Sequence, residues 1–75
     1  MDVMVNGERR AVPEGTTVAQ LLGLLKVAPE RVVVEVNLTI LKRADHVATA
    51  LKPGDQVEVV HFVGGGSVSE SQTKR

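Results

Sequence analysis

The sequence contains no cysteine, tryptophan or tyrosine, and its 75 residues include a single phenylalanine. Without cysteine, the chain cannot form a disulfide framework, a thiol nucleophile or a thiolate metal site. With one aromatic ring, it offers no platform on which successive bases could stack. We therefore expect neither redox chemistry on sulfur side chains nor a nucleic-acid partner.

Excess charge and long apolar runs are also lacking. Nine Lys and Arg residues balance nine Asp and Glu residues, so no overall field attracts a polyanion or an anionic membrane surface. No apolar stretch approaches the roughly 18 residues that a membrane span needs. The first residues carry an acid and lack the basic stretch of a signal peptide. We expect one small cytoplasmic domain without membrane contact.

What the sequence does contain is a set of short β segments separated by turn residues. Asn6-Gly7 lies between residues 1–5 and 8–12 and predicts a two-residue hairpin turn. Lys52-Pro53-Gly54-Asp55 predicts a second turn, because proline presets φ and glycine accepts positive φ. Further strands are expected at residues 31–37, 38–41 and 56–63.

One helix is predicted between these strands. Thr17 and Gln20 have the spacing of a capping box, and the helix should end near Lys26. An apolar stripe runs along it, formed by Val18, Leu21, Leu22 and Leu25. Residues 42–51 are ambiguous, with a single helical turn possible around Val47, Ala48 and Leu51. The pattern predicts an α+β fold, a mixed sheet of four to five strands with one main helix packed on one face.

The glycines Gly64, Gly65 and Gly66 directly follow the last apolar strand. Because glycine has no side chain, such a tail can enter a narrow channel of another protein's active site, although a plain flexible linker has the same composition. Phe62, beside the tail, is expected either to anchor an interface or to lie in the core. The two histidines, His46 and His61, are expected at the surface or an edge, without a metal or acid–base role.

Several of these motifs, in this order, resemble the ThiS family, the sulfur carriers of thiamine thiazole synthesis. They are the hairpin, the Thr-capped Val-Ala-Gln-Leu-Leu helix, Val34-Glu35-Val36-Asn37, the turn leading into Gln56-Val57 and the Val-Gly-Gly-Gly ending. The resemblance covers residues 1–66 and implies a ubiquitin-like β-grasp domain. It also implies a protein that is a substrate of enzymes rather than a catalyst, and no cofactor of its own.

In this family the final glycine is the residue that is adenylated and carries the sulfur. In this sequence that glycine corresponds to Gly66, and Gly64 and Gly65 form the tail before it. The resemblance implies three partners. An ATP-dependent ThiF-like activating enzyme adenylates the glycine, a donor such as a cysteine desulfurase supplies sulfur to form a thiocarboxylate, and a ThiG-like thiazole synthase takes that sulfur.

Residues 67–75 depart from the family pattern, because they place the Gly66 carboxylate in a peptide bond. Their small polar and charged side chains predict a disordered C-terminal extension. Three explanations of this extension remain open. A protease could remove it, it could be an addition that comes from cloning or occurs only in one strain, or the chain could be a degenerate family member that no longer carries sulfur. Two other functions also stay open, a carrier like the small subunit of molybdopterin synthase and a non-carrier β-grasp interaction module with a glycine linker.

Overall fold

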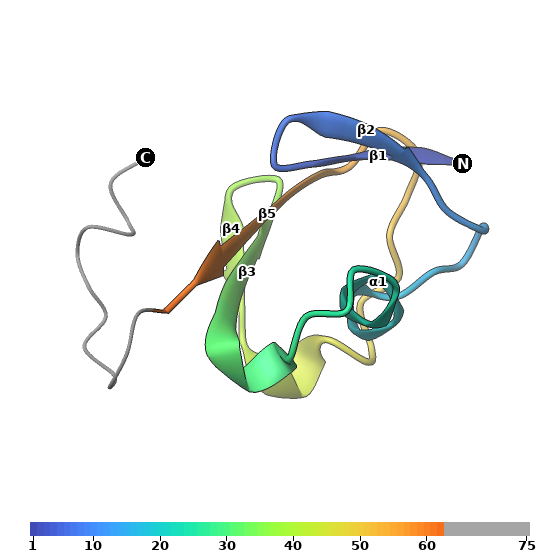
Figure 1. The fold of residues 1–75 in the computed structure, drawn as a ribbon. Coiled ribbons are helices and arrows are strands. Elements are labelled where there is room, and N and C mark those ends of the chain that lie inside the picture. The colour runs from blue at the N-terminus through green and yellow to red at the C-terminus, as the bar shows by residue number, and fades with distance from the viewer. Residues whose placement is uncertain (63–75) are drawn as a thin grey trace.

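The computed structural model describes residues 1–62, and residues 63–75 lie outside the described part (Figure 1). The elements are, in chain order, β1 (Asp2–Val5), β2 (Glu8–Ala11), α1 (Val18–Leu24), the 3₁₀ turn η1 (Pro29–Arg31), β3 (Val32–Val36), β4 (Thr39–Leu41), the 3₁₀ turn η2 (Arg43–Asp45) and β5 (Gln56–His61). None of the helices found within residues 1–62 is long and apolar enough to cross a membrane.

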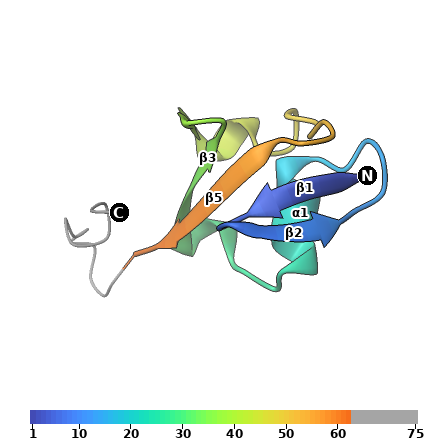
Figure 2. The ribbon, with the colours of Figure 1, turned by 90° about the horizontal axis from the view of Figure 1, so that it is seen from above.

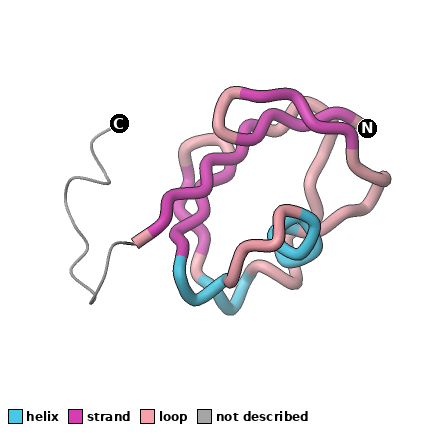
Figure 3. Tube along the Cα trace, in the orientation of Figure 1, coloured by secondary structure: helices cyan, strands magenta, loops and turns pink. Residues whose placement is uncertain are grey.

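The five strands form one mixed sheet in the order β2-β1-β5-β3-β4, so the last strand lies at its centre. β1 and β5 are parallel, and the other neighbours are antiparallel. The sheet curves around α1, which covers one face (Figures 1 and 3). Viewed from above, β5 runs between β1 and β3 toward the C-terminal end (Figure 2). The predicted α+β class, with one main helix on one face of the sheet, is confirmed.

The first hairpin forms because its two turn residues accept positive φ. Asn6 has φ 51° and Gly7 has φ 85°, as the mirror-image turns of tight hairpins require. The Asn6 side chain also bonds to the backbone of Val59: its Nδ2 donates to the carbonyl oxygen at 3.2 Å, and its Oδ1 accepts from the N–H at 2.8 Å. Where β1 ends, a side-chain amide therefore continues the pairing with the central strand.

The predicted capping box begins α1. The Thr17 hydroxyl accepts from the Gln20 N–H at 3.1 Å, and the Gln20 side chain accepts from the Thr17 N–H at 2.9 Å. Lys26 has φ 61°, which ends the helical path after Leu25. Of the predicted stripe, Leu25 is partly buried and the other three residues are buried, namely Val18, Leu21 and Leu22. They pack against valines of β1, β3 and β5 to form the core.

Residues 42–51 differ from the expectation. The only helical turn in this stretch is η2, at its start, whereas Val47 is 71% exposed and Leu51 is buried. The expected surface position of His46 is wrong, because this side chain is only 3% exposed. Its carbonyl oxygen accepts from the Ala19 N–H at 3.1 Å, which holds the loop against the start of α1. His61 is exposed, as predicted.

Candidate functional site

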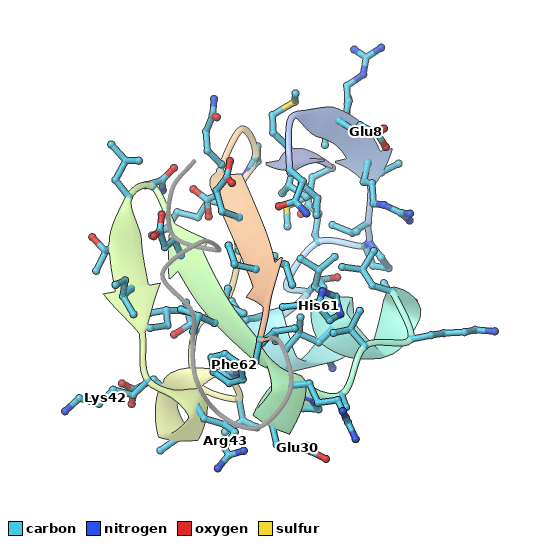
Figure 4. The ribbon with its side chains drawn as sticks, turned by 60° about the vertical axis from the view of Figure 1, so that its left-hand side comes forward. Glu8, Glu30, Lys42, Arg43, His61 and Phe62 are labelled. Carbon is cyan, nitrogen blue, oxygen red and sulfur yellow. The ribbon has the colours of Figure 1, made fainter. Side chains whose placement is uncertain are left out.

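The candidate site is the C-terminal end of the central strand, where the chain leaves the sheet. The Phe62 N–H donates to the Arg31 carbonyl oxygen at 2.9 Å, so the pairing with β3 extends as far as Phe62. The Phe62 side chain is 39% exposed. Figure 4 shows Phe62 with Arg43 and Glu30 below it. Phe62 is thus neither fully exposed nor part of the core, and its role as an interface anchor stays a prediction.

The predicted tail residues Gly64, Gly65 and Gly66 lie outside the described residues, as do residue 63 at the end of the predicted last strand and the extension at residues 67–75. What the structure does establish is the position from which the tail begins. It follows the middle strand of the sheet, which pairs with β1 at Gln56 and Val57 and with β3 from Val57 to His61. A tail on such a strand starts from a fixed point.

A groove with a volume of about 290 Å³ lies beside Phe62, between η1 and the start of β3 on one side and β4 and the segment that follows it on the other. Its walls are largely apolar, and a cation and an anion also line it. The lining residues include Val33, Ile40, Leu41 and Phe62, together with Glu30 and Arg43. The groove was not predicted, because its walls come from parts of the chain that are distant in sequence. Its composition suits an apolar side chain with a polar end.

His46 also lines this groove, and neither of its buried ring nitrogens has a hydrogen-bond partner within residues 1–62. Burial lowers the pKa of the imidazole below its usual value of 6.5. The Arg43 guanidinium lowers the pKa further, and the Asp45 carboxylate opposes both effects. The ring is therefore neutral at neutral pH. No pattern in the sequence signalled this position, since an isolated histidine in a loop gives no periodicity.

The part of the chain that the structure describes contains no group of three or more His, Cys, Asp or Glu side chains able to hold a metal ion. The groove offers a neutral imidazole and two opposite charges rather than a ligand set.

A mixed sheet curved around one helix, with the last strand at its centre, defines a ubiquitin-like β-grasp domain (Figure 1). The model of the ThiS family matches residues 3–66. This chain belongs to the ThiS family. The resemblance inferred from the sequence motifs is therefore confirmed, and the thiamine branch is favoured over the molybdopterin and non-carrier alternatives.

Three similar proteins support this assignment. The chain is 46% identical over 66 residues to a thiazole synthase of Magnetococcus marinus, covering 88% of this chain and 20% of that protein. It is 42% identical over 67 residues to a thiazole synthase of Paramagnetospirillum magneticum, covering 89% and 21%. It thus spans about a fifth of each of these relatives. The crystal structure of the thiamine biosynthesis protein ThiS from Geobacter metallireducens has 45% sequence identity and a TM-score of 0.77, covering 88% of this chain and all of that one.

Proposed function

We propose that this chain carries sulfur for thiazole formation in thiamine biosynthesis, as a thiocarboxylate at Gly66. The observation that carries the proposal is the match to the ThiS family, which extends through Gly66. In this role the chain is a protein co-substrate of other enzymes and not itself a catalyst. Gly64 and Gly65 form the narrow part of the tail that enters the partner's active site.

The chemistry explains why a terminal glycine is needed. A carboxylate is a poor acyl donor, so one of its oxygens first attacks the α-phosphate of ATP and pyrophosphate leaves. The terminal sulfur of a donor persulfide then displaces AMP from the acyl adenylate and forms an acyl disulfide. A thiol reductant supplies two electrons to cleave the sulfur–sulfur bond, which leaves the thiocarboxylate on the carrier and a thiol on the donor. Glycine presents no side chain that would hinder either attack.

Three partners follow from this scheme: a ThiF-like activating enzyme, a sulfur donor such as a cysteine desulfurase, and a thiazole synthase. The last is supported by the two thiazole synthases of which about a fifth resembles this chain. In those proteins a segment like this chain is covalently part of the synthase, so the two functions are linked. Because activation consumes ATP, the proposed location is the cytoplasm.

The peptide bond between Gly66 and Ser67 must be broken before Gly66 can react. An amide has no free carboxylate oxygen, so it cannot attack ATP. We place the carrier domain at residues 1–66 and the removable extension at residues 67–75. Cleavage at this bond by a protease would produce the reactive form.

The test compares the full chain with a chain that ends at Gly66, each mixed with ATP and the activating enzyme. Only the shorter chain should form an acyl adenylate. With a sulfur donor its intact mass should rise by about 16 Da, the difference between sulfur and oxygen in a terminal thioacid. Equal adenylation of the uncleaved full chain would refute the need for processing. If neither chain reacted, the glycines would be a linker and the carrier function would be wrong.

A further inference from the structure

The two β-hairpins hold the central strand from opposite sides through the same type of side chain. Asn6 and Asn37 are each the first residue of a two-residue turn, with φ 51° and φ 52°. Asn, Asp and Gly all accept positive φ at this position, so the turn alone does not require an amide. Yet both amides bond to the backbone of β5, which lies between the two hairpins (Figure 1). Each asparagine therefore does more than form a turn.

The Asn6 amide takes the place of a strand where β1 has ended. β1 pairs with β5 at Gln56 and Val57, and the Asn6 N–H donates to the Val57 carbonyl oxygen at 2.9 Å. The Asn6 side chain reaches two residues further, because it bonds to both the N–H and the carbonyl oxygen of Val59. Of the three residues that favour this turn position, only asparagine carries both a donor and an acceptor on its side chain. The choice of asparagine thus matches the two backbone groups of Val59.

Beyond Val59 the central strand is held from one side within residues 1–62. Its pairing with β3 continues to His61, and the Phe62 N–H then donates to the Arg31 carbonyl oxygen. Without the Asn6 amide, this one-sided stretch would begin at residue 58 instead of residue 60. Strands paired on one side twist more strongly than strands inside a sheet. The Asn6 amide therefore limits the twisting of β5 just before the tail.

We propose that Asn6 is a positioning residue for the adenylation of Gly66, because it fixes the direction in which β5 ends. This inference rests on the proposed function. Gly66 is seven residues beyond Val59, which is at most about 25 Å of extended chain. Over that length, a change of about 10° in the direction of the strand moves the end of an extended tail by about 4 Å. Since a misplacement of about 1 Å can slow a reaction about a hundredfold, the direction of β5 matters for the chemistry.

Two glycine variants separate positioning from stability. Asn6→Gly removes the amide and keeps the turn, because glycine accepts positive φ without strain. Asn37→Gly is the matched control, with the same substitution at the same position of the other hairpin turn. The Asn37 amide accepts from the Gln56 N–H at 2.9 Å, at the start of β5, and donates to the Asp55 carboxylate at 3.0 Å. Each variant loses two side-chain hydrogen bonds, so their losses of global stability should be similar.

Adenylation is measured in single turnover on the chain ending at Gly66, which retains every described element, with ATP and the activating enzyme in excess. Asn6→Gly should lower the rate constant at saturating enzyme about tenfold and leave the half-saturating enzyme concentration within about twofold of the parent. A merely destabilised carrier would bind less at a given enzyme concentration but react at the parental rate once bound. Asn37→Gly should react like the parent. Equal slowing in both variants would show a general loosening of the sheet and overturn the role of Asn6.

Amide hydrogen exchange locates the change in the free protein. In Asn6→Gly, exchange should become about tenfold faster at Val59 and at Phe62, because the end of β5 opens more often. In Asn37→Gly, exchange should become faster at Gln56 and stay unchanged at Phe62. Unchanged exchange at Phe62 in Asn6→Gly would mean that β3 alone fixes the end of the strand, and the inference would be wrong.

The same measurements separate this inference from the proposed function. If the shortened parent is adenylated and Asn6→Gly reacts at the parental rate, only the positioning role of Asn6 is wrong. If the shortened parent is not adenylated, the proposed function is wrong. The positioning role then falls with it, even where exchange at Phe62 shows that the end of β5 has loosened.

Discussion

His46 is the residue whose surroundings conflict most with its chemistry. Its ring is buried and both nitrogens lack partners within residues 1–62. A buried polar group without a hydrogen bond costs about 1–3 kcal/mol. The histidine is therefore a local weakness in the fold, located beside the groove at the end of the central strand.

We predict that His46 makes the protein less stable in mild acid. Its pKa is lowered in the folded state, so the unfolded chain binds more protons at pH values between the lowered pKa and the usual 6.5. The free energy of unfolding should fall as the pH drops below 6.5. Urea denaturation at several pH values measures this slope for the parent and for His46→Leu, which should lose the contribution of His46.

The matched control is His61→Leu, because His61 is the other histidine and is exposed. In this variant the free energy of unfolding should fall with decreasing pH as steeply as in the parent, between pH 6.5 and mild acid. An unchanged slope in His46→Leu would show that other groups cause the acid sensitivity.

At the scale of the element, α1 depends on its capping box and on the core. It has seven residues, and isolated helices shorter than about 12 residues are marginal in water. The capping box satisfies two backbone N–H groups at its start. Its buried face then packs against valines of the sheet.

This dependence predicts a large difference between two leucines of the same helix. Leu22 is fully buried and Leu24 is 57% exposed. Leu22→Ala should reduce the free energy of unfolding by about 2–5 kcal/mol, because it leaves a cavity in the core. Leu24→Ala removes the same atoms from the surface and should change it by less than about 0.5 kcal/mol. Chemical denaturation of both variants checks this, and similar losses would contradict the observed orientation of α1.

At the scale of the whole molecule, the described core is complete before the chain reaches the glycines. Every residue of the described core lies between Val3 and Val59, and the last described backbone pairing is that of Phe62 with Arg31. The central strand is therefore fixed before the tail begins. The chemistry proposed for Gly66 and the described core therefore use different parts of the chain.

This separation predicts that ending the chain at Gly66 leaves stability nearly unchanged. The free energies of unfolding of the full and shortened chains should agree within about 0.5 kcal/mol, because no described core residue is removed. Denaturation in urea gives both values. A larger loss on shortening would mean that residues 67–75 contribute to the folded domain.

The sequence predicted those structural features that depend on interactions between residues close together in the chain. Positive φ at Asn6 and Gly7, the capping box of Thr17 and Gln20, and the strand expected at residues 31–37 all depend on a few neighbouring residues. The glycine triplet and the nearby Phe62 could also be recognised from the sequence, because they depend only on the order of residues along the chain. From these the fold class and the family could be inferred.

Only the tertiary structure decided which distant residues meet. β5 could have been an edge strand, but it lies between β1 and β3, and the register of β3 and β5 sets Glu58 against Glu35. The groove and the burial of His46 likewise depend on segments from both halves of the chain. Strand pairing and burial are settled by the simultaneous packing of all elements, and no local pattern encodes which partner a residue will find.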